Sequence, residues 1–399
     1  MKSMLTRSAA FLWKMLVGGA LCQFAFTAIF VIGWTFRAMQ RCAVKRWWKL
    51  SDRSKAGLTF REDAMTAPEL RPFAAWPRWC TATEGLRTTA ATLKSRVGIW
   101  AKVRLFLHGL FHSLKANFVL GIQGIFNVAV ITAIPVLLWQ FGWYAGWDNS
   151  FNKGYEQFDV GVTISLSGIF LFLIVMLYLP MAQARQAVTG DWRSFYQFKL
   201  VWRLVQRRRI ACLSLAGAFS LCSIPLTISR VIPVFVSQNN ETLIAMNDLE
   251  LLAWANRYFF WMSVFGFIVY TFLRILTARI YAGAILEAYQ ERALRADELS
   301  PFERHMLGGL QLVDQKELGH RPLALKIVGA AARPPWRAAM TMATLLIWFT
   351  FVAQLYVSEF LVYHPSRGFI NQPLVHLPWF RYVPDALEES ANEIMAATK

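Results

Sequence analysis

Runs of about twenty apolar residues recur along the chain, separated by segments that carry most of its charge. They cover residues 15–36, 118–139, 160–180, 210–231, 258–276 and 338–362. A helix of twenty residues rises about 30 Å, which matches the thickness of the hydrocarbon core of a bilayer. The pattern therefore predicts an all-α membrane protein with six transmembrane helices.

The charged segments between these runs alternate in character, and the alternation predicts their orientation. Segments 37–117, 181–209 and 277–337 hold most of the 42 Lys and Arg residues, whereas the loops that alternate with them are short and acidic. Basic residues beside spans stay in the cytoplasm. We therefore expect both termini outside the cytoplasm, with residues 363–399 forming an extracytoplasmic tail.

The first apolar run superficially resembles a signal peptide, because Lys2 and Arg7 precede it. It is too long for one, since the apolar region of a signal peptide spans about 7 to 15 residues. We interpret residues 1–36 as an uncleaved transmembrane anchor. Residues 37–117 then form a basic cytoplasmic loop, and residues 118–362 form a core of five transmembrane helices.

Within the basic loop, residues 89–115 place apolar side chains on one broad face at helical spacing. This pattern predicts an amphipathic helix that lies in the headgroup plane of the cytoplasmic leaflet. The residues expected to contact lipid are Arg46, Trp47, Trp48, Lys94, Trp100 and Lys102. Their charge favours anionic lipids as partners.

The segment from Lys45 to Lys49 also fits single-stranded RNA, because it combines cations with aromatic rings. Trp beside Lys next to a span is, however, the usual pairing at a membrane interface. We therefore prefer lipid and expect no nucleic-acid partner.

Composition agrees with the membrane interpretation. The 399 residues are 56% hydrophobic and 17% charged, with a mean hydropathy of +0.37, whereas soluble proteins carry about 25% charged residues. Cations beside spans account for most of the net charge of +18. The five cysteines show no CxxC spacing, so neither a disulfide framework nor a zinc site is indicated.

Arg230 and Glu359 lie near the outer ends of the fourth and sixth predicted spans, where an ionisable group is costly unless it pairs or reaches water. They form a candidate intramembrane polar pair. A substrate or ion site is one interpretation, and a structural pair or two snorkelling side chains is the other.

The sequence gives little indication of metal binding, cofactor binding or catalysis. His108 and His112 are four residues apart and share a helix face, but a third ligand and the HExxH glutamate are missing. We therefore expect no metal, cofactor or catalytic residue. Gln23, Gln123, Asn127 and Gln354 lie well within predicted spans and are expected to link helices.

The exit of the third predicted span has Pro180, then Ala184-Arg185, then Gly190-Asp191. This order, followed by a Phe-containing amphipathic helix, resembles a signature in a family of uncharacterised bacterial and archaeal multi-span membrane proteins, a domain of unknown function. The resemblance covers residues 118–291. It implies a prokaryotic plasma membrane and no known chemistry.

The expected function is non-enzymatic. Kinked spans and interfacial helices favour a permease-like component or an assembly or scaffold partner for other membrane proteins, with a homo-oligomer as a further arrangement. The alternative is a membrane enzyme that acts on lipid head groups.

Overall fold

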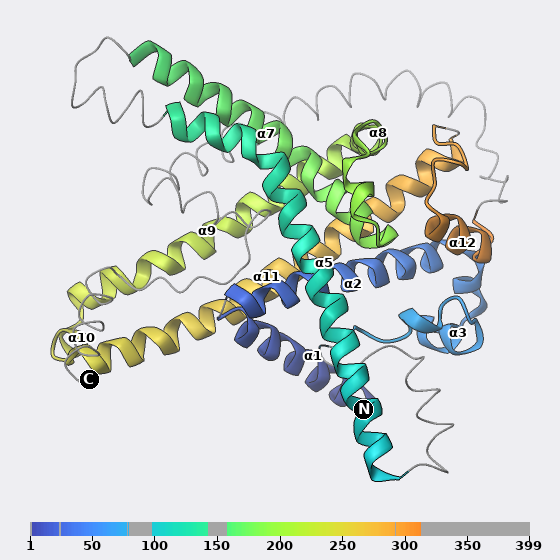
Figure 1. Cartoon of the computed structure of the whole chain (residues 1–399), viewed down its shortest axis with the longest axis horizontal. Helices are drawn as coiled ribbons and strands as arrows, with labels where there is room; N and C mark the ends of the chain where they lie inside the picture. Colours follow the sequence, from blue (N-terminus) through green and yellow to red (C-terminus); the bar gives the residue numbers. More distant parts are fainter. Residues whose placement is uncertain are drawn as a thin grey trace. The chain divides into compact units, whose positions relative to one another are not determined.

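The computed structural model of the chain describes residues 2–23, 25–77, 79, 98–142, 158–291 and 293–312, and in these ranges it is all-helical (Figure 1). The α-helices are α1 (Lys2–Leu21), α2 (Ala25–Leu50), α3 (Phe60–Thr66), α5 (Ile99–Gly142), α7 (Phe158–Thr189), α8 (Phe198–Arg207), α9 (Arg209–Asn239), α10 (Glu241–Ile244), α11 (Asp248–Gln290) and α12 (Pro301–Gly309). Short 3₁₀ helices are η1 (Asp52–Ala56), η2 (Arg71–Phe73) and η5 (Trp192–Tyr196).

Three of these helices are long and apolar enough to cross a membrane. The apolar stretches are Ser113–Pro135 in α5, Leu166–Thr189 in α7 and Leu249–Gln290 in α11. They overlap the second, third and fifth predicted spans. Two shorter apolar stretches occur, Phe11–Leu21 in α1 and Arg209–Phe219 in α9. The sixth predicted span, residues 338–362, lies outside the described residues.

The first apolar run, residues 15–36, is divided between two helices. α1 ends at Leu21, and a turn at residues 22–23 precedes α2. The hydroxyl of Thr27 donates to the carbonyl of Leu21. This bond satisfies one of the carbonyls that the end of a helix leaves open. The anchor predicted from this run is therefore a pair of helices and not a single one.

α5 also departs from the sequence prediction. We expected residues 89–115 to lie flat on the membrane and a separate span to begin at residue 118. Residues 99–142 instead form one unbroken helix of 44 residues, about 66 Å long at 1.5 Å per residue. The prediction of a separate helix before the second span is therefore wrong for residues 99–115, which continue into that span. The position of these residues at the membrane surface stays a prediction, and residues 89–97 lie outside the described part.

The described residues group into two compact units. Unit 1 contains those in 2–31 and 218–272, and unit 2 contains those in 32–217 and 273–312.

Within unit 1, glycines allow α1 to approach α11 closely. A Cβ atom built at Gly19 would lie 2.4 Å from Cγ2 of Val264, and one at Gly18 would lie 2.1 Å from the ring of Phe267. Small residues permit this kind of approach between membrane helices. Gln23 Nε2 also donates to Ser263 Oγ on α11. The prediction that Gln23 links helices is thus confirmed.

Within unit 2, α5 crosses α2 at a glycine (Figure 1). A Cβ atom at Gly33 would lie 1.8 Å from the carbonyl oxygen of Asn117, so no larger residue fits without a shift of the backbone. The Oδ1 atom of Asn117 accepts a hydrogen bond of 3.0 Å from Arg37 Nη1. The crossing is thereby fixed by both packing and a polar contact.

The first basic loop folds back onto α2 through aromatic contacts. The ring of Trp34 stacks on that of Trp79 at a centroid distance of 4.6 Å, and its Nε1 donates to the Pro77 carbonyl at 3.0 Å. The buried Arg41 guanidinium lies 4.7 Å from the Trp76 ring, within the range of a cation–π interaction. Trp76 and Trp79 of this loop therefore pack against α2.

Candidate functional site

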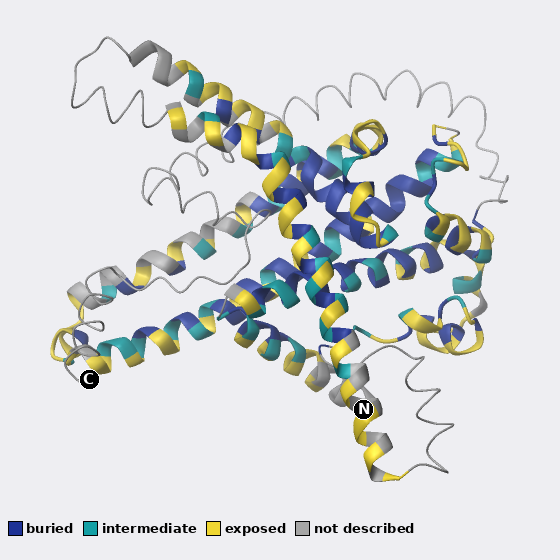
Figure 2. Cartoon of the chain, viewed as in Figure 1, coloured by how far each residue is buried: buried dark blue, intermediate teal, exposed yellow. Residues whose placement is uncertain are grey.

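The last part of α7 is buried on all sides, in contrast to the helix before it. Every residue from 178 to 188 is buried, whereas Leu166, Phe170 and Ile174 are exposed (Figure 2). Arg185 lies in the buried stretch and is only 1% exposed. A charge at this depth is unfavourable unless it is paired and hydrogen-bonded.

Partners from four different segments surround the guanidinium of Arg185. Its Nη1 lies 3.2 Å from Glu303 Oε2 and 3.0 Å from the Tyr281 hydroxyl. Its Nη2 donates to the Glu298 carbonyl at 3.1 Å, and its Nε donates to Gln197 Oε1. All three nitrogens are therefore used, and the positive charge is neutralised inside the protein.

Glu303 is placed by the start of α12. The sequence Ser300-Pro301-Phe302-Glu303 forms a capping box, in which Glu303 N donates to Ser300 Oγ and Ser300 N donates to Glu303 Oε2. This arrangement satisfies two open donors of the helix end. The Tyr281 hydroxyl also donates to the Glu303 carboxylate. The same carboxylate thus caps α12 and ties it to α7 and α11.

Further ion pairs surround this cluster. They are Arg203–Glu298, Arg207–Glu291 and Arg208–Glu287. Arg208 donates from Nε to Glu287 Oε2 at 2.8 Å, and its guanidinium crosses α11 where Gly283 leaves room. Each pair joins the segment after the third predicted span to the segment after the fifth. The two segments were assigned to the same side of the membrane from charge alone.

The Arg203–Glu298 pair also affects the pKa of the Glu298 carboxyl group. Hydrogen bonds from Arg203 and from the backbone N–H of Arg295 hold the pKa of Glu298 below its ordinary value. Glu298 therefore stays ionised under mildly acidic conditions, and Arg203 keeps its partner there.

The first basic loop reaches the same region. Trp47 Nε1 donates to the Ala282 carbonyl at 2.9 Å, and Arg53 Nη2 donates to the Gly309 carbonyl at 3.1 Å. Arg53 also pairs with Glu69 at 3.2 Å. All three segments predicted to be cytoplasmic thus contribute to unit 2.

These contacts correct part of the predicted lipid-contacting set. Trp47 is fully buried, and Trp48 is buried with its Nε1 donating to Asp63 Oδ2 at 2.7 Å. Both indole N–H groups find acceptors inside the protein. The two rings therefore belong to the core of unit 2, and the prediction that they contact lipid is wrong.

The other residues predicted to contact lipid differ in how exposed they are, where their side chains are described. Arg46 is half-buried, and Trp100 is 86% exposed at the start of α5. Lys102 lies in α5, but its side chain is outside the described part, as is the whole of Lys94.

The candidate pair Arg230 and Glu359 stays a prediction. Arg230 lies in α9 with a side chain outside the described part, and Glu359 lies outside it altogether. His108 and His112 lie in α5, and their side chains are likewise not described. In the described ranges, no group of three or more His, Cys, Asp or Glu side chains is arranged to hold a metal ion.

Asn127 links three elements of unit 2, as expected from its place within a predicted span. Its Nδ2 lies 3.0 Å from Gln186 Oε1 on α7 and 3.2 Å from the Trp192 carbonyl on η5. Its Oδ1 accepts from the Tyr196 hydroxyl at 2.9 Å. These bonds fix the short segment after α7 against α5.

Sequence reasoning missed Glu303, Tyr281 and Gln197 as site residues, and only Glu303 carried a signal that could have been noticed. A Ser-Pro-x-Glu sequence is a recognisable helix start, so the pattern from Ser300 to Glu303 could have indicated α12. Arg185 was noticed as part of a signature but received no role. Its pairing could not be inferred, because Glu303 is 118 residues away in the chain.

Searches against family models, curated proteins and solved structures return no match. The resemblance of residues 118–291 to a family of multi-span membrane proteins therefore stays a prediction. The fold itself defines the class: an all-helical protein with helices suited to crossing a membrane.

Proposed function

We propose that this chain is a multi-pass protein of the prokaryotic plasma membrane that acts without catalysis as an assembly or scaffold partner for other membrane proteins. It has six transmembrane helices and both termini outside the cytoplasm. Two findings support this topology. Three of the predicted spans coincide with long apolar helices, and the three segments assigned to the cytoplasm contribute to one unit.

The observation that carries the scaffold proposal is the use of buried charge in unit 2. Arg185 and Glu303 are almost completely buried and bind each other, and the surrounding arginines bind the glutamates of another segment. Leaving one charge of a buried pair without its partner costs about 3 to 5 kcal/mol. A motion that pulled α7 away from α12 would therefore be strongly opposed. Such a unit suits a fixed framework on which other chains assemble.

A permease-like component is the second candidate, and one observation favours it. The chain turns at residues 22–23 within the first predicted span, and Gln23 binds Ser263 there. Helices interrupted within the membrane line the binding sites of many transporters.

The test is to isolate the full chain from its own membrane in polymer-bounded nanodiscs and to measure retained proteins by quantitative mass spectrometry. A scaffold should retain a small set of membrane proteins in a fixed ratio. The Arg185→Ala/Glu303→Ala variant should lose them, whereas Asp52→Asn, which removes an exposed pair, should keep them. A chain that is isolated alone and conducts solutes in proteoliposomes would contradict the scaffold proposal and support the permease.

A further inference from the structure

Three large aromatic side chains are exposed immediately after the apolar stretch of α7. Trp192 on η5 is 39% exposed, and Phe198 and Trp202 on α8 are 53% and 38% exposed. Phe198 and Trp202 are four residues apart, so they lie on one face of α8. Soluble surfaces rarely expose several large apolar side chains together. These three rings are called the aromatic patch below.

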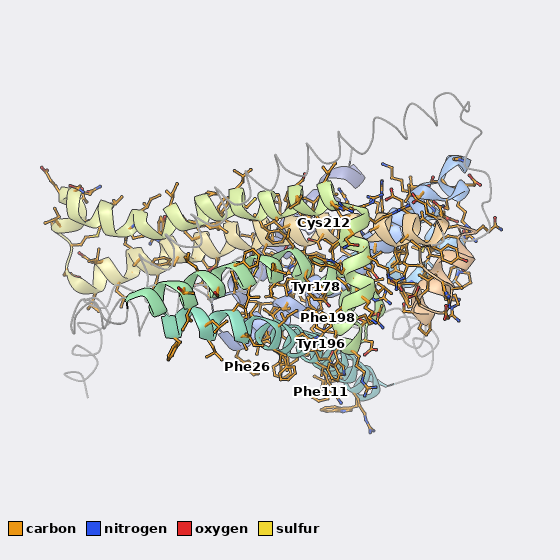
Figure 3. All side chains as sticks on the ribbon, turned by 90° about the horizontal axis from the view of Figure 1, so that it is seen from above. Phe26, Phe111, Tyr178, Tyr196, Phe198 and Cys212 are labelled. Atoms are coloured by element: carbon orange, nitrogen blue, oxygen red, sulfur yellow. The ribbon has the colours of Figure 1, made fainter. Side chains whose placement is uncertain are left out.

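The patch is held in place by ring contacts and hydrogen bonds. Trp192 contacts Tyr196 at a centroid distance of 6.1 Å, and Phe198 stacks on the buried Tyr178 at 5.3 Å. The ring centroids of Tyr196 and Phe198 lie 6.3 Å apart, and this contact links the other two (Figure 3). The Tyr178 hydroxyl donates to the Phe195 carbonyl, and the Tyr196 hydroxyl donates to Asn127 Oδ1. The rings of Trp192 and Phe198 are therefore held against Tyr196 and Tyr178.

Two cations flank the patch. Arg193 and Lys199 are exposed, and neither has a carboxylate partner among the residues that the structure describes. Their neighbours differ, because Arg203 and Arg207 bind Glu298 and Glu291. The acidic residue nearest to Arg193 in sequence is Asp191, which is also exposed. Its Oδ1 accepts a hydrogen bond from the backbone N–H of Arg193 and so caps η5. Arg193 and Lys199 thus keep their charge available to an external anion.

We infer that the aromatic patch, with Arg193 and Lys199, binds the head groups of anionic phospholipids. Amphipathic rings settle at the level of the head groups, and each cation near an anionic membrane surface adds attraction. The patch directly follows the apolar stretch Leu166–Thr189, which would place it at that level. This inference rests on the proposed membrane topology and does not depend on a scaffold role.

The test is native mass spectrometry of the detergent-solubilised full chain titrated with phosphatidylglycerol or phosphatidylcholine. The wild-type protein should bind phosphatidylglycerol more tightly. Arg193→Gln/Lys199→Gln should weaken phosphatidylglycerol binding by about fivefold for each cation removed. Binding of phosphatidylcholine should be nearly unchanged.

The matched control is Lys49→Gln/Arg61→Gln, which removes two exposed cations from the first basic loop. It should retain the wild-type preference. Trp192→Ala/Trp202→Ala should weaken binding of both lipids, with the melting temperature measured alongside to verify folding. Equal binding of the two lipids by the wild-type protein, or an equal loss in the control, would overturn the inference. Neither outcome bears on the scaffold proposal, because no partner protein is present.

Discussion

The guanidinium of Arg185 and the carboxylate of Glu303 lie 3.2 Å apart, although 118 residues separate them in the chain. Removing either charge leaves the other buried and uncompensated. We expect Glu303→Gln and Arg185→Gln each to lower the free energy of unfolding by about 3 to 5 kcal/mol. Pulse proteolysis in detergent with added denaturant measures this change.

The double variant Arg185→Gln/Glu303→Gln should lose less than the sum of the single losses, because no unpaired charge remains. Lys55→Gln is the control, since its pair with Asp52 is exposed and should contribute less than about 1 kcal/mol. Strictly additive losses would show that the two side chains do not stabilise each other.

The crossing of α2 and α5 gives a second prediction. At Gly33 a Cβ atom would overlap the Asn117 carbonyl. Gly33→Ala should therefore destabilise the protein by about 1 to 3 kcal/mol through overpacking. Gly217→Ala in α9 meets no atom within 4 Å, so it should be neutral or stabilising by up to about 1 kcal/mol. The melting temperatures of the two variants in detergent test this, and equal shifts would exclude a tight crossing.

The lowered pKa of Glu298 gives a dependence on pH. Because the folded-state pKa lies below the unfolded value, the contribution of this group is present above the ordinary carboxyl value of 4.5 and is lost as the pH falls below it. The effect should be small, since Arg203 is exposed. Melting temperatures of the wild type and Glu298→Gln should converge as the pH falls through this range. A constant difference would contradict the prediction.

The proposed topology is open to cysteine labelling. In a variant whose five cysteines are replaced by serine, we expect an impermeant maleimide applied to intact cells to label Thr242→Cys. It should not label Lys55→Cys or Gln206→Cys until the cells are opened. All three positions are exposed on the protein, so the difference would report the side of the membrane. Labelling of Gln206→Cys in intact cells would overturn the orientation.

Apolar runs of spanning length were sufficient to predict α5, α7 and α11 as helices, because length and hydropathy are local properties. The turn at residues 22–23 was not predictable, since a single polar residue, Gln23, does not by itself end a helix. The continuity of α5 was missed for a related reason. A change from amphipathic to predominantly apolar composition at residue 115 indicates a change of environment, but it does not by itself end a helix.

The candidate site was harder to predict because its contacts are long-range. In sequence, Trp47 beside Arg46 resembles a membrane-interface pair. The indole N–H of Trp47 can be buried because it donates to the Ala282 carbonyl, which lies far away in the chain. Asn127 and Gln23 were assigned correctly to helix contacts, since a polar group within an apolar span has few alternatives. The aromatic patch was overlooked, because the exposure of Trp192 and Trp202 depends on which side of η5 and α8 packs inward.

The separation of Arg185 and Glu303 in sequence also matters while the protein is being made. Translation proceeds at about 5 to 20 residues per second, so the 118 intervening residues take roughly 6 to 24 s. During this interval Arg185 of α7 lacks its carboxylate partner, and the three segments predicted to be cytoplasmic cannot yet pack around it. The capping sequence that begins at Ser300 therefore completes the Arg185 cluster late in synthesis, because it supplies the only carboxylate that pairs with Arg185 among the described residues.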